Sequence, residues 1–254
     1  MKGLKKRIYS GETLIGCWLN LGSSVTAEIV GMAGFDWVVI DLEHGTGTDK
    51  DVLHQLQALE PTPVAAVVRV ESYERQRFHR ILDLGAEGIM CPRINNPEEA
   101  QRAADAMRYP PEGIRGIAQM VRATHFGTNA RDYLASSKDT LVGIVQVESE
   151  QVLRCLDDVA AIDGIDLLFV GPSDLSMALG IFGQLDHPRF IDALKATAAA
   201  AKKAGKAAGI LMRGPEEFNK YYDLGFRFIA CGADATFVAS GARKMAGDLR
   251  ASFK

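Results

Sequence analysis

The chain has 254 residues, of which 47% are hydrophobic and 24% charged, and its formal net charge is −3. This length suits one large α/β domain, and the absence of a basic stripe argues against nucleic acid as a partner. No apolar run approaches the roughly 20 residues of a membrane span, so we expect no membrane partner and a cytoplasmic location.

Short apolar runs alternate with longer amphipathic segments along the whole chain. Eight of these runs are expected to be strands, at 14–19, 37–42, 65–70, 88–94, 141–148, 166–171, 207–212 and 227–232. Helical patterns lie between them, for example over 48–60, 96–108 and 190–205. Runs of Val, Ile and Leu without polar alternation are typical of parallel strands that are covered on both faces.

Eight such units in about 250 residues predict an α/β fold, a single-domain (β/α)8 TIM barrel over residues 1–254. The alternative is an open doubly wound sheet, which usually carries a GxGxxG motif after its first strand. Here the first strand leads into NLGSSVTAE, which favours the barrel. The segment 109–140 is longer than one connection between a strand and a helix needs, so we expect an extended active-site or oligomerisation segment there.

The active site of a (β/α)8 barrel lies at the carboxyl ends of its strands. Seven of the expected strands end in side chains that would converge there: Trp18 and Asn20; Asp41, Glu43 and His44; Arg69; Arg93; Gln146 and Glu148; Ser173 and Asp174; Leu211 and Met212.

Gln146 and Glu148 are two residues apart on a strand, so both side chains face the barrel interior. A buried carboxylate is costly unless it is paired or bound to a cation. With Asp174 from the next strand, Glu148 would form an oxygen-rich site that suits Mg²⁺ or Mn²⁺, with Co²⁺ as a further choice. The alternative for Asp174 is a helix cap, whereas Ser149 is the better cap candidate beside Glu148.

Arg69 lies between valines in VVRV and therefore needs a negative partner. Asp41 or Glu148 would satisfy it structurally, and a substrate carboxylate or enolate would satisfy it functionally. His44 is either a general base or an ordinary hydrogen-bonded loop histidine. The backbone N–H groups of Ser173 and Asp174, at the start of a helix, form a candidate anion site.

Five segments together resemble the HpcH/HpaI aldolase family of metal-dependent class II pyruvate aldolases. They are GCWLNLGSSVTAEIVGMAGFDWVVIDLEHG, LDLGAEGIMCPRINNPEEA, YPPEGIRGI, VQVES and DLLFVGPSDLSMALG. The resemblance implies a (β/α)8 barrel, a divalent metal (Mg, Mn or Co) and a homo-oligomer, either a trimer or a hexamer. It also implies small-molecule partners, a 2-oxo acid and an aldehyde.

Matching motifs carry the roles of the family's residues to this chain. The resemblance implies that Glu148 and Asp174 bind the metal, that His44 is the catalytic base, that Asp83 raises its basicity, that Arg69 stabilises the enolate, and that Gln146, Ser173 and Asp174 hold pyruvate. Trp18 and Leu211 are expected to line the substrate site, with Leu211 on the aldehyde side.

The implied reaction is reversible aldol cleavage of a 4-hydroxy-2-oxo acid to pyruvate, or hydroxypyruvate, and an aldehyde through a metal-stabilised enolate. Two alternatives stay open. One is a metal-dependent oxaloacetate decarboxylase or tautomerase that uses the same site. The other is a barrel that binds carboxylates without catalysis.

Overall fold

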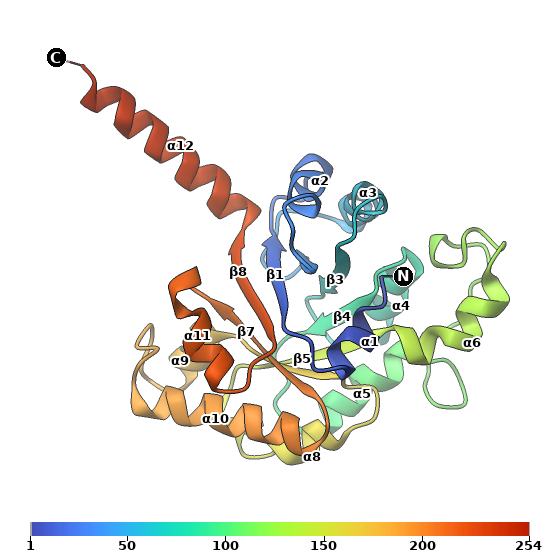
Figure 1. Ribbon diagram of the computed structural model, residues 1–254. Helices are drawn as coiled ribbons and strands as arrows, with labels where there is room; N and C mark the ends of the chain where they lie inside the picture. Colours follow the sequence, from blue (N-terminus) through green and yellow to red (C-terminus); the bar gives the residue numbers. More distant parts are fainter. Residues whose placement is uncertain (1, 254) are drawn as a thin grey trace.

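The computed structural model describes residues 2–253, which form a closed barrel of eight parallel strands in chain order (Figure 1). The strands are β1 (Leu14–Leu19), β2 (Trp37–Asp41), β3 (Ala65–Arg69), β4 (Gly88–Cys91), β5 (Val142–Val147), β6 (Leu167–Val170), β7 (Ala207–Met212) and β8 (Phe228–Ala233). β8 pairs with β1 and closes the barrel. The predicted (β/α)8 barrel is confirmed, and the open sheet is excluded.

The helices that follow or precede these strands are α1 (Leu4–Tyr9), α2 (Ser24–Gly31), α3 (Asp49–Leu59), α4 (Arg75–Asp83), α5 (Pro97–Met107), α6 (Ala130–Thr140), α7 (Glu150–Leu153), α8 (Leu156–Ala161), α9 (Pro172–Ala178), α10 (Pro188–Lys203), α11 (Phe218–Asp223) and α12 (Asp234–Ala251). The three helices expected at 48–60, 96–108 and 190–205 correspond to α3, α5 and α10. Local capping explains the start of α5, where the Asn96 side chain accepts a hydrogen bond from the Glu99 N–H and Pro97 occupies the first turn. No helix in residues 2–253 is long and apolar enough to cross a membrane.

The fourth strand departs most from the length that the sequence predicts. The apolar run over 88–94 contributes only Gly88–Cys91 to the sheet. Pro92 has no N–H to donate, and Arg93 adopts a left-handed backbone conformation with φ of 56°. The chain therefore turns out of the sheet directly after Cys91, and this turn aims the Arg93 N–H at the barrel mouth.

Two apolar layers hold the barrel together. The outer layer lies between the strands and the helices, and includes Val145 and Val147 of β5. The inner layer fills the barrel with aromatic rings, of which Trp37 and Phe228 stack with centroids 3.7 Å apart. Leu4 of α1 belongs to the inner layer, so α1 covers the amino end of the barrel and the carboxyl end stays open for a site.

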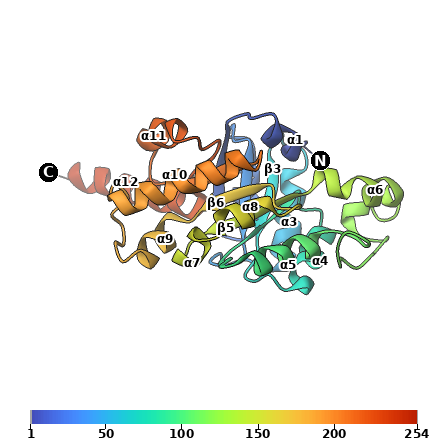
Figure 2. The same cartoon turned by 90° about the horizontal axis from the view of Figure 1, so that it is seen from below.

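Two segments extend from opposite sides of the barrel (Figure 1, Figure 2). Residues 109–140 carry a short 3-10 helix, η1 (Arg122–Thr124), and α6. α12 points away from the barrel instead of packing along its wall (Figure 1), and Asp234 is its buried residue. The expectation that 109–140 serves the active site or assembly stays a prediction.

Candidate active site

A cavity of about 510 Å³ opens at the carboxyl ends of the strands. It is lined by eight residues that the sequence placed in the site: Trp18, His44, Arg69, Gln146, Glu148, Ser173, Asp174 and Leu211. Trp18 lies on its floor against Phe169, with ring centroids 5.5 Å apart. Among the residues that the structure describes, no lysine lines this cavity.

Arg69 is the last residue of β3, and its guanidinium is fixed by two carboxylates, one at the end of β2 and one in the loop that follows. Its Nε and Nη2 donate to the two oxygens of Asp41 at 2.9 Å and 2.7 Å, and Nη1 lies 2.8 Å from Glu43 Oε2. Burial opposes the charge on Arg69, but its hydrogen bonds to Asp41, together with the negative charges of Asp41, Glu43 and Glu148, outweigh burial and raise the pKa of the guanidinium. Three of its five N–H groups are used in this way, which leaves two for a ligand in the cavity.

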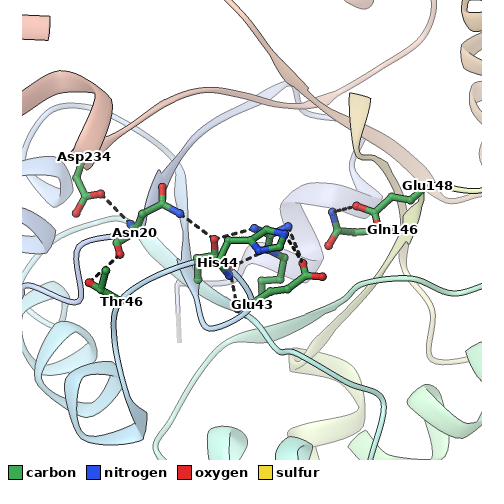
Figure 3. Close-up of polar contacts among 9 residues, drawn as sticks. Asn20, Glu43, His44, Thr46, Gln146, Glu148 and Asp234 are labelled. Atoms are coloured by element: carbon green, nitrogen blue, oxygen red, sulfur yellow. Dashed lines mark hydrogen bonds and ion pairs between the residues drawn. The ribbon is translucent and has the colours of Figure 1, made fainter. Parts of the chain in front are cut away.

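A hydrogen-bonded loop holds Asp41 in turn. Asn20 donates its side-chain amide to Asp41 Oδ2 at 2.8 Å, and the Glu43 N–H donates to Oδ1 at 3.0 Å. Figure 3 shows Asn20 between Asp234 and this loop, because the Asn20 N–H donates to Asp234 Oδ1 at 2.8 Å. Asp234, the first residue of α12, therefore belongs to the network that positions Arg69.

His44 reaches the cavity from the loop after β2. Its side chain is 67% exposed, and its Nε2 lies 3.9 Å from Glu43 Oε2. Burial raises the pKa of Glu43, which faces Arg69 and His44 together. The imidazole is thus accessible to solvent and ligand, as a proton-transfer group must be.

Glu148 is a buried acid of the cavity wall, at 8% exposure. Its Oε1 accepts from Gln146 Nε2 at 2.7 Å, and its Oε2 accepts from the Arg93 N–H at 3.1 Å. Burial raises the pKa of Glu148 to about 7, and Asp174 and Glu43 add to the rise by repulsion. Gly171 packs directly against this carboxylate, where a Cβ would overlap it.

Neither acid serves as the side-chain cap of the helix that follows it. Ser149 caps α7 by accepting from the Val152 N–H, so Glu148 is not the cap. α9 begins after Gly171 and has no side-chain cap, which places Asp174 two residues inside the helix. Within residues 2–253 no hydrogen bond or ion pair occupies the Asp174 carboxylate, which lines the cavity beside Glu148.

These atoms fit a divalent cation. Gln146 Oε1 is buried without a hydrogen-bond donor, and Glu148 has no direct cationic partner in the described chain. No group of three or more His, Cys, Asp or Glu side chains in residues 2–253 could hold a metal by itself. Two carboxylates with the remaining positions left to water and substrate suit Mg²⁺ or a similar hard cation.

Asp83 does not line the cavity of this chain, and its predicted effect on His44 stays a prediction. Asp83 ends α4, shortly before β4 begins, so it lies at the amino end of the barrel. Its carboxylate binds Arg115 Nη2 at 2.8 Å, and Arg115 is itself enclosed by Tyr133 and Tyr109. Asp83 therefore anchors the 109–140 segment in this chain.

Several residues in or beside the cavity have no role predicted from the sequence, among them Glu43, Arg213 and Thr236. Glu43 was placed at the end of β2, but its contact with Arg69 depends on the turn of the following loop. Arg213 and Thr236 line the mouth from the segments after β7 and β8. Arg213 carries the clearest sequence signal, since it follows Leu211 by two residues and so faces the same way.

Comparison with known proteins agrees with this geometry. The model of the HpcH/HpaI aldolase/citrate lyase family matches residues 14–240. The chain belongs to this family. It is 40% identical over 242 residues to a hydroxypyruvate/pyruvate aldolase of Agrobacterium fabrum, which covers 95% of this chain and 91% of the relative.

Two further family members are similar over nearly their whole length. A 4-hydroxy-2-oxo-heptane-1,7-dioate aldolase of Klebsiella pneumoniae is 38% identical over 95% of this chain and 91% of the relative. The crystal structure of a HpcH/HpaI aldolase/citrate lyase family protein from Burkholderia cenocepacia superposes with a TM-score of 0.93. It is 38% identical over 98% of this chain and 100% of that one. Membership of the HpcH/HpaI family makes this protein a lyase of the aldolase type.

Proposed function

We propose that this protein catalyses the reversible aldol cleavage of 4-hydroxy-2-oxo acids to pyruvate, or hydroxypyruvate, and an aldehyde. The observation that carries the proposal is the convergence of Arg69, His44 and the buried Glu148 on one cavity. The family relatives named as aldolases support it. The reaction needs a stabiliser for a developing enolate and a group that moves the proton of the substrate hydroxyl.

Glu148 and Asp174 would hold a divalent cation, Mg²⁺, Mn²⁺ or Co²⁺, in this reaction. When bound, such a cation supplies Lewis-acid stabilisation for negative charge on the 2-oxo acid. The protein's own groups do the rest. Gln146 faces the same position and offers its amide to the substrate, and Ser173 lines the wall where the substrate carboxylate would lie.

Arg69 and His44 have different roles because their surroundings differ. Arg69 is held rigidly by Asp41 and Glu43, so its two free N–H groups stabilise the enolate oxygen without reorganising. His44 is exposed and takes the proton from the C4 hydroxyl during cleavage, directly or through a water molecule. In the condensation direction it returns that proton to the new alkoxide.

The test is exchange of the pyruvate methyl protons with D₂O, followed by NMR with Mn²⁺ or Mg²⁺ and again after EDTA. We expect exchange with metal and none with the chelator, because proton exchange reports the enolate and needs no choice of aldehyde. Folded protein that shows no exchange with any of the metals contradicts the proposal. Oxaloacetate turnover far above aldol cleavage would assign the site to decarboxylation instead.

We also propose that the chain works as a homo-oligomer built through α12. This helix exposes Val238, Met245 and Leu249 to solvent. On the barrel, Ile15 of β1 is 40% exposed. Val25 and Ile29 of α2 and Met32 directly after it are exposed too, so an apolar strip of the wall lacks a covering helix. An isolated amphipathic helix is marginal in water, and a second copy supplies an apolar face of the right kind.

Light scattering of the full chain tests the assembly. We expect a mass of a multiple of 27.5 kDa for the wild type and a lower mass for a Met245→Glu, Leu249→Glu double variant. Lys244→Glu, beside Met245 on the same helix, is the control that changes charge without removing apolar surface. A wild-type monomer contradicts the proposal.

A further inference from the structure

A second cavity, of about 760 Å³, lies at the amino end of the barrel, opposite the active site. It is bordered by the end of α1, the exposed face of α10 and the turn that leads from α11 into β8. Ala207 and Ala208 at the start of β7 line it, whereas Leu211 and Met212 at the other end of β7 line the active-site cavity. Small-molecule sites typically occupy about 300–1,000 Å³, so this cavity is large enough for one.

The wall of this second cavity is basic. It carries four cationic side chains and one acidic side chain, although the chain as a whole has a net charge of −3. The cations are Lys195, Lys202, Lys206 and Arg227, and the acid is Asp223. A cleft whose walls carry mainly one sign of charge concentrates the electric field and attracts ligands of the opposite sign. The composition of the wall therefore favours an anionic ligand.

Two of the lysines lie on one face of α10. Lys195 and Lys202 are about two helical turns apart, which separates them by about 10 Å along the helix axis. Ala198 and Ala199 lie between them and also line the cavity, so short side chains leave room there. The Lys195 ammonium lies 4.0 Å from the Asp192 carboxylate, and within residues 2–253 the Lys202 ammonium has no hydrogen bond or ion pair. Both ammonium groups can therefore bind a ligand.

Arg227 supplies a two-pronged donor on the opposite wall. Its Nη1 donates to the carbonyls of Tyr222 and Phe226 at 2.8 Å and 2.9 Å, and its guanidinium lies 3.9 Å from the centre of the Tyr222 ring. Its Nε and Nη2 have no hydrogen-bond partner in the part of the chain that the structure describes. This edge of a guanidinium can bind two oxygens of one phosphate in parallel. Arg227 is thus held by the protein on one side and open to an anion on the other.

Tyr9 adds an aromatic surface beside these cations. Its residue is 51% exposed, and its hydroxyl donates to Asp166 Oδ1 at 2.8 Å, which fixes the ring. The Lys5 ammonium lies 3.0 Å from the same carboxylate and balances its charge. A fixed and half-exposed ring offers a face on which a planar group can stack. The cavity therefore combines sites for anions with a site for an aromatic group.

We propose that this cavity binds an organic polyphosphate of the size of a nucleoside diphosphate. The phosphates lie between Arg227 and the two lysines of α10, and the planar organic part lies on Tyr9. Lys206, whose ammonium donates to the Ile162 carbonyl at 2.5 Å, adds its charge to the phosphate side. Because the cations of α10 alone span about 10 Å, a ligand with several anionic groups matches them better than a single phosphate.

Calorimetric titration of the full-length protein tests the proposal. The probes are ADP, pyrophosphate and adenosine, and EDTA is present so that no divalent cation joins a phosphate to the active-site carboxylates. We expect one ADP to bind per chain, pyrophosphate to bind more weakly, and adenosine not to bind. Pyrophosphate that binds as tightly as ADP would support the phosphate site but overturn the stacking on Tyr9. An absence of ADP binding would overturn the proposal as a whole.

Two variants of the cavity wall should change the affinity in opposite directions. In a Lys195→Gln, Lys202→Gln double variant, we expect the Kd for ADP to rise about tenfold or more, because two charged hydrogen bonds are lost. Asp223→Asn removes the acid of the wall and should lower the Kd about two- to fivefold, since the repulsion of an exposed charge is weak. The second variant keeps the test decisive if the first does not fold.

The matched control is a Lys203→Gln, Lys244→Gln double variant. It changes the net charge by the same amount, but neither lysine lines the cavity: Lys203 pairs with Asp157 at 2.6 Å and Lys244 lies on α12. We expect the wild-type Kd for this control, and thermal unfolding shows whether each variant is folded. Equal Kd values in the control and in both cavity variants would place ADP elsewhere and overturn the proposal. None of these titrations depends on the aldolase reaction.

Discussion

Arg69 and Asp41 form a buried pair in which two parallel hydrogen bonds, of 2.9 Å and 2.7 Å, join the guanidinium to the carboxylate. The Asp41 side chain is buried, and its oxygens accept hydrogen bonds from Arg69 and from the loop that carries His44. Asp41 therefore supports Arg69. The orientation of the Arg69 guanidinium in the cavity therefore depends on Asp41.

Arg69→Lys is predicted to lower metal-dependent pyruvate exchange by about 10²-fold or more. Lysine keeps the positive charge beside Asp41, but it cannot bind two oxygens in one plane and still present N–H groups to the enolate. The rate of exchange, followed by NMR under saturating metal, is the measurement. Exchange at the wild-type rate would remove Arg69 from the chemistry.

Gly171→Ala is predicted to weaken metal binding at least tenfold. The added methyl group overlaps the Glu148 carboxylate, which must then move away from Asp174. Isothermal titration with Mn²⁺ measures the change. Gly116→Ala is the control, because a Cβ there meets only the end of a flexible arginine side chain at 3.9 Å. Equal affinities in both variants would mean that Glu148 is not a ligand.

The buried Glu148 makes metal affinity depend on pH. Burial raises its pKa from 4.5 to about 7, and the cation needs the deprotonated carboxylate. Apparent affinity should therefore fall up to tenfold per unit as the pH drops below about 7, with proton release on binding. Titration in two buffers of different ionisation enthalpy counts these protons at pH 6.

The raised pKa of Glu148 also makes the stability of the metal-free protein depend on pH, in the direction opposite to that of metal affinity. A raised pKa means that the folded state favours the protonated acid, so stability is fullest below pH 4.5 and falls as the pH rises through about 7. Glu148→Gln should lack this loss. Urea unfolding of the wild type and of Glu148→Gln at pH 5 and pH 8 measures the free energy of unfolding of each. An identical pH dependence in both proteins would refute the raised pKa of Glu148.

Asp234→Ala is predicted to lower both stability and activity. The buried carboxylate accepts the Asn20 N–H at 2.8 Å and the Thr26 hydroxyl at 2.8 Å, and its removal leaves these donors unpaired at a cost of about 1–3 kcal/mol. Asn20, which donates to Asp41, is then held less firmly. Urea unfolding and kcat measure the two effects. Thr46→Ala, which removes a 3.3 Å bond to the Asn20 carbonyl, should cost less of either.

The sequence predicts the barrel well because its signal is local. Each strand is an apolar run. The alternation of positions along β5 and into the residue after it is enough to place Gln146 and Glu148 inside and Val145 and Val147 outside. The rim of the site follows from the same rule, because all strands of a parallel barrel end at one edge.

The parts that could not be predicted depend on turns and on distant partners. Nothing local in Asp83 shows that Arg115 binds it, and no periodicity reveals the left-handed turn at Arg93 that brings its N–H to Glu148. The direction of α12 was also open, since an alanine-rich helix fits a barrel wall and a subunit contact equally well. Such features depend on contacts between residues that are far apart in the sequence, and a short segment of sequence does not reveal these contacts.

The aromatic filling of the barrel gives the molecule a built-in optical probe. The chain has two tryptophans, Trp18 and Trp37, and their rings lie 6.1 Å apart inside the barrel. Trp18 forms part of the cavity floor and faces Arg69 at 5.9 Å, so a charged ligand that binds the guanidinium alters the electric field around an indole. Intrinsic fluorescence can therefore follow occupancy of the site in the unlabelled wild-type protein.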